Sequence, residues 1–485
     1  MANPVMMLKN RIKEFSSSAA LRMEVYIFFF FLIAFVFFAR YNDWNYDEST
    51  SYKGVLNNNL WDLLTYSKFK LANSHLINSV YFMLLQHGHV INVVYYRLLS
   101  LLGFLLFFIA NSRILKLLKI NNFYIIFLTI APYFFYFSYG RGYALAIGCF
   151  AMAFFYLLKY TKDQQVKYEY LIVFFGAIST LSIFSFLYGF LSILIVFGIF
   201  KIKHLKSIHT FLLSFFVLAL LFYIYKVGKI VNENDPSIIG INNFSLFKYG
   251  TVSSIFSDFS YRDYLVSLFF NDASPIRIIT YFKLLITLCI VIPFFYIRKI
   301  NFRAIDLTNI KTTLVLLIFL PFLFMAAAHI FTNALYPLTR AVFYLHYLIL
   351  LFVLVSTVTY SKKIIFYIPV IIICATSLIY SCYAYCDLSR PTIKQALITT
   401  KNYPLYVLFT NDKSVGLINN LYGINKKNIS EGRSTQNIIP LLQKDTSKIR
   451  YIICWPEYRD SCLVYFKNTS VYKYRDGYSL IKILR

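Results

Sequence analysis

Residues 26–48 read Tyr-Ile-Phe-Phe-Phe-Phe-Leu-Ile-Ala-Phe-Val-Phe-Phe-Ala-Arg-Tyr-Asn-Asp-Trp-Asn-Tyr-Asp-Glu, an apolar run that gives way abruptly to polar residues. The apolar part, Tyr26 to Ala39, predicts a membrane-spanning helix, so the polar part emerges at a membrane surface. The polar stretch continues to Asn78 and contains Asp47, Glu48 and His75. It is the densest cluster of proton-handling groups before the C-terminal tail, and we expect the active site of a membrane enzyme there.

The composition of the whole chain indicates the same class of protein. Of the 485 residues, 59% are hydrophobic and only 14% are charged. Such a chain is too apolar for a soluble globular protein and predicts an all-α polytopic membrane bundle. The net charge of +27 does not indicate nucleic-acid binding, because the basic residues lie between the apolar runs, where they orient a membrane protein.

The apolar runs predict about eleven transmembrane helices. Basic residues precede the first run and fall in alternate connections, which places the N-terminus in the cytoplasm and the C-terminus outside the inner membrane. The first run lacks a cleavage signal and is expected to remain as an anchor. For residues 122–158, and likewise for residues 170–200, two alternatives remain: one hairpin or a broken helix. The runs are 26–39, 92–112, 122–138, 142–158, 170–186, 187–200, 209–225, 277–297, 312–331, 341–360 and 364–381.

The long connections all fall on the outer side of this topology. They are residues 41–91, residues 226–276 and the tail from Cys382 onward. We therefore divide the chain into a transmembrane module, 1–381, and an extracytoplasmic α/β domain, 382–485.

Within this tail, the sequence pattern predicts both secondary structure and cysteine chemistry. Strands are expected at 406–410, 451–455 and 463–466, and helices at 415–422 and 437–443. A disulfide is permitted among the outward cysteines, with the pairing left open. These cysteines are Cys382, Cys386, Cys454 and Cys462.

Two neighbouring acids are our choice of catalytic residues. A carboxylate held near an apolar wall loses hydration, which raises its pKa and makes it a better base. Asp47 and Glu48 follow the first apolar run directly, so one can take a proton while the other orients a ligand or a divalent metal ion. A solvated loop pair is the alternative. No P-loop or GxGxxG motif is present to hold a nucleotide cofactor.

Three further residues are candidates for substrate contacts. His75 can bond a substrate hydroxyl, ligate a metal, or simply cap a helix expected at 76–86. Arg141 lies between two glycines at a predicted outward turn, where a guanidinium can pair with a phosphate at two points. Arg340 occupies the matching outward position, and we expect both arginines to lie on the same cavity as Asp47. Arginines that merely extend to the interface are the alternative.

Four segments together resemble a known family. They are Tyr46-Asp-Glu48, Asn73-Ser-His-Leu-Ile-Asn-Ser-Val-Tyr-Phe82 followed by Tyr96-Arg-Leu-Leu-Ser100, and Gly140-Arg-Gly-Tyr-Ala-Leu145. They resemble bacterial GT-C glycosyltransferases of the protein mannosyltransferase and aminoarabinose transferase type. The resemblance covers residues 20–160, and Leu76-Ile77 stands where those enzymes have Pro-Pro.

The resemblance implies a GT-C bundle that takes sugar from a polyprenyl-phosphate donor and inverts the anomeric carbon. It implies Asp47 as the general base, Glu48 as its neighbour and Arg141 near the donor phosphate. The acceptor would be a lipid or glycan of the cell envelope. A polysaccharide polymerase or ligase, or a flippase of a lipid-linked saccharide, is the alternative. The substrate-binding candidates are His75, Asn78, Arg141, Tyr143 and Arg340.

Overall fold

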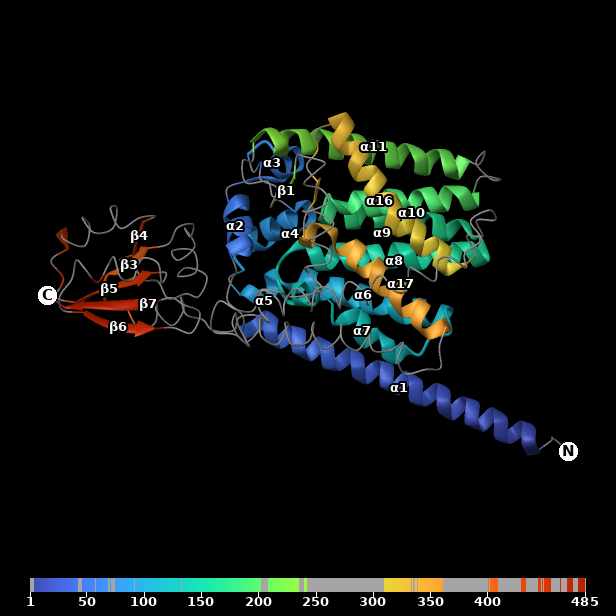
Figure 1. Ribbon diagram of the computed structural model, residues 1–485. Helices are drawn as coiled ribbons and strands as arrows, with labels where there is room; N and C mark the ends of the chain where they lie inside the picture. Colours follow the sequence, from blue (N-terminus) through green and yellow to red (C-terminus); the bar gives the residue numbers. More distant parts are fainter. Residues whose placement is uncertain are drawn as a thin grey trace, which may run out of the picture. The chain divides into compact units, whose positions relative to one another are not determined.

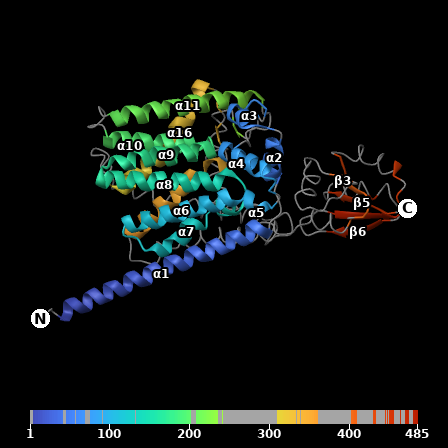
Figure 2. The same cartoon turned by 180° about the vertical axis from the view of Figure 1, so that it is seen from behind.

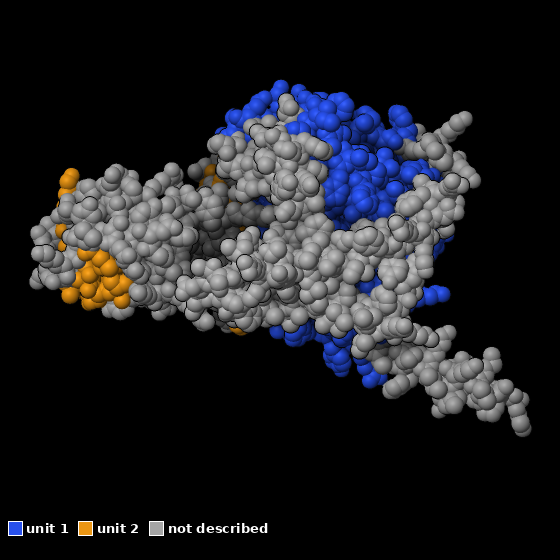
Figure 3. Space-filling view, in the orientation of Figure 1, with its two compact units in different colours: residues 1–36, 60–80, 98–382 blue, residues 37–59, 81–97, 383–485 orange. Residues whose placement is uncertain are grey.

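The computed structural model describes two compact units (Figure 3, blue and orange). They comprise residues 1–36, 60–80 and 98–382, and residues 37–59, 81–97 and 383–485. The described residues are 4–41, 46–56, 58–68, 70, 75–90, 92–131, 133–201, 208–234, 240–241, 309–332, 334, 336–337, 339–360, 400, 402–408, 429–432, 444–445, 447, 449–454, 463, 469–473 and 479–484.

The first unit is helical (Figure 1). A two-residue antiparallel pairing joins β1 (Gly240–Ile241) to β2 (Tyr336–Pro337). The short 3-10 helices are η1 (Asn122–Tyr124), η2 (Phe134–Ser138) and η6 (Thr339–Val342). The α-helices are the greater part of α1 (Pro4–Tyr41), α3 (Leu60–Thr65), the start of α4 (Leu76–His87), α6 (Leu98–Leu117), α7 (Ile125–Thr129), α8 (Gly142–Asp163), α9 (Val166–Ser182), α10 (Phe186–Lys201), α11 (Ile208–Asn234), α16 (Ile310–Thr332) and α17 (Phe343–Tyr360).

Five of the described helices are long and apolar enough to cross a membrane. These segments are Arg22–Arg40, Leu98–Leu117, Gly142–Asp163, Phe211–Val231 and Ile310–Thr332, and two shorter apolar helices cover Phe186–Lys201 and Phe343–Val358. The predicted class, an α-helical membrane bundle with a small C-terminal sheet, is therefore confirmed. The runs expected at 277–297 and 364–381 lie outside the described residues.

One predicted span is not a continuous helix. Residues 122–138 form η1, α7 and η2 instead of one rod. Pro132 explains the break, because proline has no backbone N–H to donate and disfavours helical geometry in the residue before it. The run expected at 92–112 is also divided, into α5 (Val93–Tyr96) and α6, with Arg97 between them.

Helices α6 and α8 approach each other at their glycines. A Cβ at Gly103 would overlap the backbone of Ala144, and a Cβ at Gly148 would overlap the carbonyl of Gly103. Small residues permit such close packing between membrane helices. Ser100 contacts the residues before α8, while Gly103 contacts residues inside it, so the two helices run parallel and begin at the same end.

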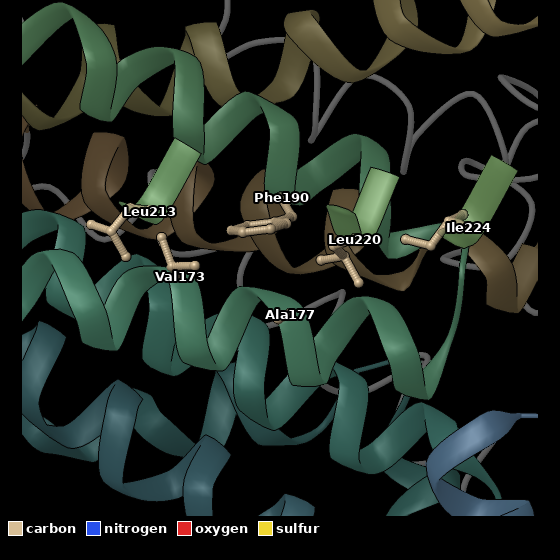
Figure 4. Packing of buried hydrophobic residues seen from close by; sticks show 6 residues of the cluster. All are labelled: Val173, Ala177, Phe190, Leu213, Leu220 and Ile224. Atoms are coloured by element: carbon tan, nitrogen blue, oxygen red, sulfur yellow. The ribbon is translucent and has the colours of Figure 1, made fainter. Parts of the chain in front are cut away.

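The helices α6, α8 and α9 lie side by side in that order, followed by α10 and α11 (Figures 1 and 2). Between α9, α10 and α11 lies a cluster of apolar side chains (Figure 4). The opposite side of α11 exposes large apolar residues, such as Phe211 and Phe222, as expected of a helix in contact with lipid. The cluster consists of Val173, Ala177, Phe190, Leu213, Leu220 and Ile224.

The second unit contains α2 (Tyr46–Val55), α5 and a mixed five-stranded sheet. The strand order is β4-β3-β5-β7-β6, with β3 parallel to β4 and β5, and β7 antiparallel to β5 and β6. Parallel neighbours require crossover connections, which is typical of an α/β domain. The strands are β3 (Leu405–Leu408), β4 (Ile429–Gly432), β5 (Ile449–Cys454), β6 (Thr469–Lys473) and β7 (Ser479–Leu484).

The strands expected at 406–410 and 451–455 correspond to β3 and β5. Strands β4, β6 and β7 were not expected from the sequence pattern. The strand expected at 463–466 falls almost entirely outside the described residues, as do both helices expected in the tail. Cys382, Cys386 and Cys462 are also outside them, so the disulfide pairing stays a prediction, as does the division at residue 381.

Candidate active site

The two predicted catalytic acids lie in the first turn of α2. Acidic residues are favourable there, because the first backbone N–H groups of a helix carry partial positive charge. The backbone of Asp47 is described but its side chain is not. Glu48 is buried, with its side chain 1% exposed, beside the fully buried Arg97. Arg97 Nε donates to Glu48 Oε1 at 2.9 Å and Nη2 donates to Oε2 at 2.7 Å.

Arg97 also holds the end of α1. Its Nη1 donates to the carbonyl oxygen of Ala39 at 2.9 Å, one of the last carbonyls of a helix, which lack partners within the helix. The same guanidinium thus joins the end of α1 to the beginning of α2. A charge pair removed from water is stable only when its geometry and hydrogen bonds are good. The three bonds meet that requirement.

These contacts indicate that Glu48 positions α2. Both of its oxygens accept from one guanidinium, so the carboxylate is held in an ion pair in this arrangement. Further contacts support α2, since Gln86 Nε2 donates to the Tyr52 carbonyl at 2.9 Å and the Tyr52 and Tyr96 rings pack edge to face. The catalytic role of Asp47 stays a prediction.

Four predicted substrate-binding residues meet at the beginning of α8. Asn78 Nδ2 donates to the Gly140 carbonyl at 3.0 Å. The rings of His75 and Tyr143 pack edge to face with centroids 5.1 Å apart. The Arg141 guanidinium lies over the Tyr143 ring, 5.5 Å from its centroid. The structure therefore brings together residues that are far apart in the sequence.

This group of side chains is buried. Arg141 is 1% exposed, and His75, Asn78 and Tyr143 are also buried. Gly142 explains how closely the segments approach, because a Cβ there would meet the Ser182 carbonyl and come within 3.1 Å of His75 Cβ. A guanidinium, an imidazole, an amide and a phenol thus lie in a bundle otherwise rich in apolar side chains. Such groups can recognise a phosphate and hydroxyls.

Arg340 lies in η6, and only its backbone is described. The turn is fixed by Ser185, whose hydroxyl donates to the Ala341 carbonyl at 2.7 Å. Three residues after Arg340, the ring of Phe343 packs against that of Tyr143, with centroids 5.8 Å apart. The backbone around Arg340 is thereby connected to the Tyr143 group. The expectation that its side chain shares a cavity with Arg141 and Asp47 stays a prediction.

Sequence reasoning missed the contacts of Arg97 and Ser100. Both stood in the segment that carried the family resemblance, without an assigned contact. A signal was present for Arg97, because it stood inside the run expected to span at 92–112. A charge in such a position is costly unless it is paired, so a search for its partner among the scarce acids would have reached Glu48.

Within the described parts of the chain, no group of three or more His, Cys, Asp or Glu residues could hold a metal ion. The metal ligands considered from the sequence were Asp47, Glu48 and His75. The oxygens of Glu48 accept hydrogen bonds from the Arg97 guanidinium, and the side chain of Asp47 is not described. Metal dependence stays a prediction.

No family model matches the chain, and no curated protein matches it in sequence. It is similar in structure to ArnT. The crystal structure of ArnT from Cupriavidus metallidurans in the apo state aligns with a TM-score of 0.48 and 10% sequence identity, over 96% of this chain and 98% of that chain. At this identity and TM-score the likeness carries no argument about function, which must be argued from the side chains of this chain.

Proposed function

We propose that this protein is a membrane glycosyltransferase of the inner membrane. It moves a sugar from a polyprenyl-phosphate donor to a lipid or glycan acceptor of the cell envelope. The observation that supports this most is the meeting of His75, Asn78, Arg141 and Tyr143 at the beginning of α8. Polar side chains are costly inside a membrane bundle, and where they gather they generally serve function.

Arg141 is the residue assigned to the donor phosphate. A guanidinium offers a planar set of donors that fits two phosphate oxygens. Its burial strengthens this attraction, because a low-dielectric surrounding screens charge much less than water does. The phosphate gains negative charge as it leaves, so a fixed cation there stabilises the transition state more than the bound donor.

Asp47 is the residue assigned to the acceptor. The acceptor hydroxyl oxygen forms a bond to the anomeric carbon while the bond from that carbon to the phosphate oxygen breaks. The hydroxyl proton passes to the Asp47 carboxylate, and the electron pair of the broken bond leaves with the polyprenyl phosphate. Attack from the face opposite the leaving group inverts the anomeric carbon. Glu48 is held by Arg97, so the base is the other acid of the pair.

The test is transfer by the purified protein in proteoliposomes, with a panel of synthetic polyprenyl-phosphate sugars as donors and extracted envelope lipids and glycans as acceptors. Release of polyprenyl phosphate reports turnover whichever sugar is used. Asp47→Asn should lower turnover by about 10²–10⁴-fold, as loss of a general base does. The matched control is Asp163→Asn, a partly exposed acid 3.5 Å from Lys159, which should leave turnover unchanged.

A second variant separates this function from its alternatives. Arg141→Lys keeps the charge but loses the planar fork, so turnover should fall while the protein still folds. A polymerase or ligase would be sensitive to Arg141 and indifferent to Asp47. A flippase would move the donor across the bilayer without releasing polyprenyl phosphate. Unchanged turnover in Asp47→Asn would remove the proposed mechanism.

A further inference from the structure

The segment that presents Arg141 is a short extended turn between η2 and α8. Tyr139 has φ −105° and ψ 143°, and Arg141 has φ −126° and ψ 148°. One hydrogen bond closes the turn, from the Arg141 N–H to the Tyr139 carbonyl at 2.7 Å. Residues 139–141 belong to no described helix or strand, yet their surroundings are buried. Buried carbonyls without partners are costly, so side chains must supply donors.

All three carbonyl groups of the turn accept hydrogen bonds from side chains. Asn78 Nδ2 donates to Gly140 at 3.0 Å. The Ser100 hydroxyl donates to the carbonyls of Tyr139 and Arg141, the latter at 3.2 Å. A hydroxyl has one hydrogen, so Ser100 shares it between the carbonyls on both sides of Gly140. The backbone on either side of the Arg141 side chain is therefore tied to α6 and α4.

The close contact of α6 with α8 brings Ser100 to this position. Gly103 lies against the backbone of Ala144, and Ser100 precedes Gly103 by about one helical turn, on the same face of α6. The hydroxyl therefore reaches the residues just before α8 begins. The contact at Gly103 fixes the distance between α6 and α8, and at this distance the Ser100 hydroxyl reaches the carbonyl groups of the turn.

We propose that Ser100 is a positioning residue for Arg141. Its hydroxyl holds the turn in the conformation that presents the guanidinium to the donor phosphate, without touching the donor itself. This inference rests on the proposed function, since it assigns Ser100 to the phosphate site of the same enzyme. A merely structural serine would satisfy buried carbonyls and affect folding, but it would not alter phosphate binding through Arg141.

The experiment measures binding of a polyprenyl phosphate without sugar, as a rise in the melting temperature of the detergent-solubilised full chain. This ligand is the leaving group common to all such donors, so neither transfer nor the identity of the sugar enters the measurement. Ser100→Ala should need about tenfold more ligand for the half-maximal shift, the order expected when one buried hydrogen bond is lost. Equal affinity in Ser100→Ala and wild type overturns the inference.

The matched control is Ser192→Ala. Ser192 is also a fully buried serine whose hydroxyl donates to a backbone carbonyl, that of Tyr188 at 2.8 Å, but within its own helix. Its loss should leave the affinity for the phosphate unchanged. If Ser100→Ala does not fold, Ser100→Cys takes its place, because a thiol of similar shape is a much weaker donor. Ser100→Cys should then weaken phosphate binding as expected for Ser100→Ala, and an affinity equal to that of the wild type overturns the inference.

A double variant tests whether Ser100 acts through Arg141. In an Arg141→Lys background, Ser100→Ala should weaken binding much less than it does in the wild type, because residues acting as one unit are not additive. Full additivity overturns the inference. Failure of the proposed function is a separate outcome, in which polyprenyl phosphate does not bind the wild type or Asp47→Asn retains full transfer.

Discussion

Glu48 and Arg97 stand 49 residues apart and form a two-point ion pair, at 2.9 and 2.7 Å, with side chains 1% and 0% exposed. The pair brings the residue directly before α6 against the first turn of α2. The position of the Asp47 backbone therefore depends on a contact that lies far from it in the sequence.

Glu48→Ala should destabilise the protein strongly. It leaves a buried guanidinium without its carboxylate, which costs about 3–5 kcal/mol. Thermal unfolding in detergent measures the effect. The double variant Glu48→Met with Arg97→Met should lose less stability than Glu48→Ala does, because it leaves no buried charge. A double variant that is less stable than Glu48→Ala would contradict the role of the pair.

Arg97→Lys should lower turnover more than it lowers donor affinity. Lysine keeps the positive charge but cannot make the three directed bonds to Glu48 and Ala39. The first turn of α2 then loses its fixed position, and a misplacement of about 1 Å can cost 10²-fold in rate. Steady-state kinetics with the donor varied separates kcat from KM. An effect confined to KM would show that the pair serves donor binding instead.

Gly103→Ala should destabilise the bundle by about 1–3 kcal/mol or more, because the added methyl group would overlap the Ala144 backbone. Gly228 on α11 is a matched control, because a Cβ there meets nothing within 4 Å. Gly228→Ala should keep or slightly raise the melting temperature, since alanine is the better helix former. An equal loss of stability in the two variants would mean that α6 and α8 can move apart at little cost.

The C-terminal sheet should depend on pH through Asp445. The Tyr406 hydroxyl donates to Asp445 Oδ2 at 2.6 Å, and the Ser447 N–H donates to Oδ1 at 2.8 Å. Burial alone would raise the pKa of Asp445, but these hydrogen bonds outweigh it and hold the pKa below its usual value. The stabilisation is therefore present above about pH 3.9, the ordinary pKa of an aspartate, and is lost as the pH falls through the lowered value.

Tyr406→Phe tests this dependence. At pH 7 the variant should be less stable by about 1–3 kcal/mol, the size of a hydrogen bond to a charged group. The difference in stability from the wild type should narrow below about pH 4, because a protonated carboxyl accepts a weaker hydrogen bond from the Tyr406 hydroxyl than a carboxylate does. Limited proteolysis of the full chain across this range measures it. A difference that does not vary with pH would exclude Asp445 as the cause.

The fold class could be predicted from the sequence because the apolar runs are long and dominate the composition. The helix expected at 76–86 is found as α4, one residue longer, since its pattern is local. Residues 122–138 show the limit of that reasoning. Their composition is that of a span, but one proline prevents a continuous helix, and hydropathy does not register the missing backbone donor.

The candidate site was predicted in part. His75, Asn78, Arg141 and Tyr143 were chosen from short motifs, and the structure places them together. Glu48 was chosen as a catalytic residue; the structure shows it paired with Arg97, and its catalytic role stays a prediction. The sequence shows which groups are ionisable, whereas the partner of each depends on packing between segments far apart along the chain.

The ion pair of Glu48 and Arg97 also implies an order of events during biosynthesis. The chain is made from its N-terminus, so α1 and Glu48 leave the ribosome well before Arg97 does. Until then the carboxylate has no guanidinium and must stay hydrated, because burying it alone would be costly. We therefore expect the segment that carries Asp47 to take its position only after Arg97 has been made and α6 begins to enter the membrane. In a nascent chain stopped before Arg97, the segment that carries Asp47 should be accessible to modifying reagents from the aqueous side.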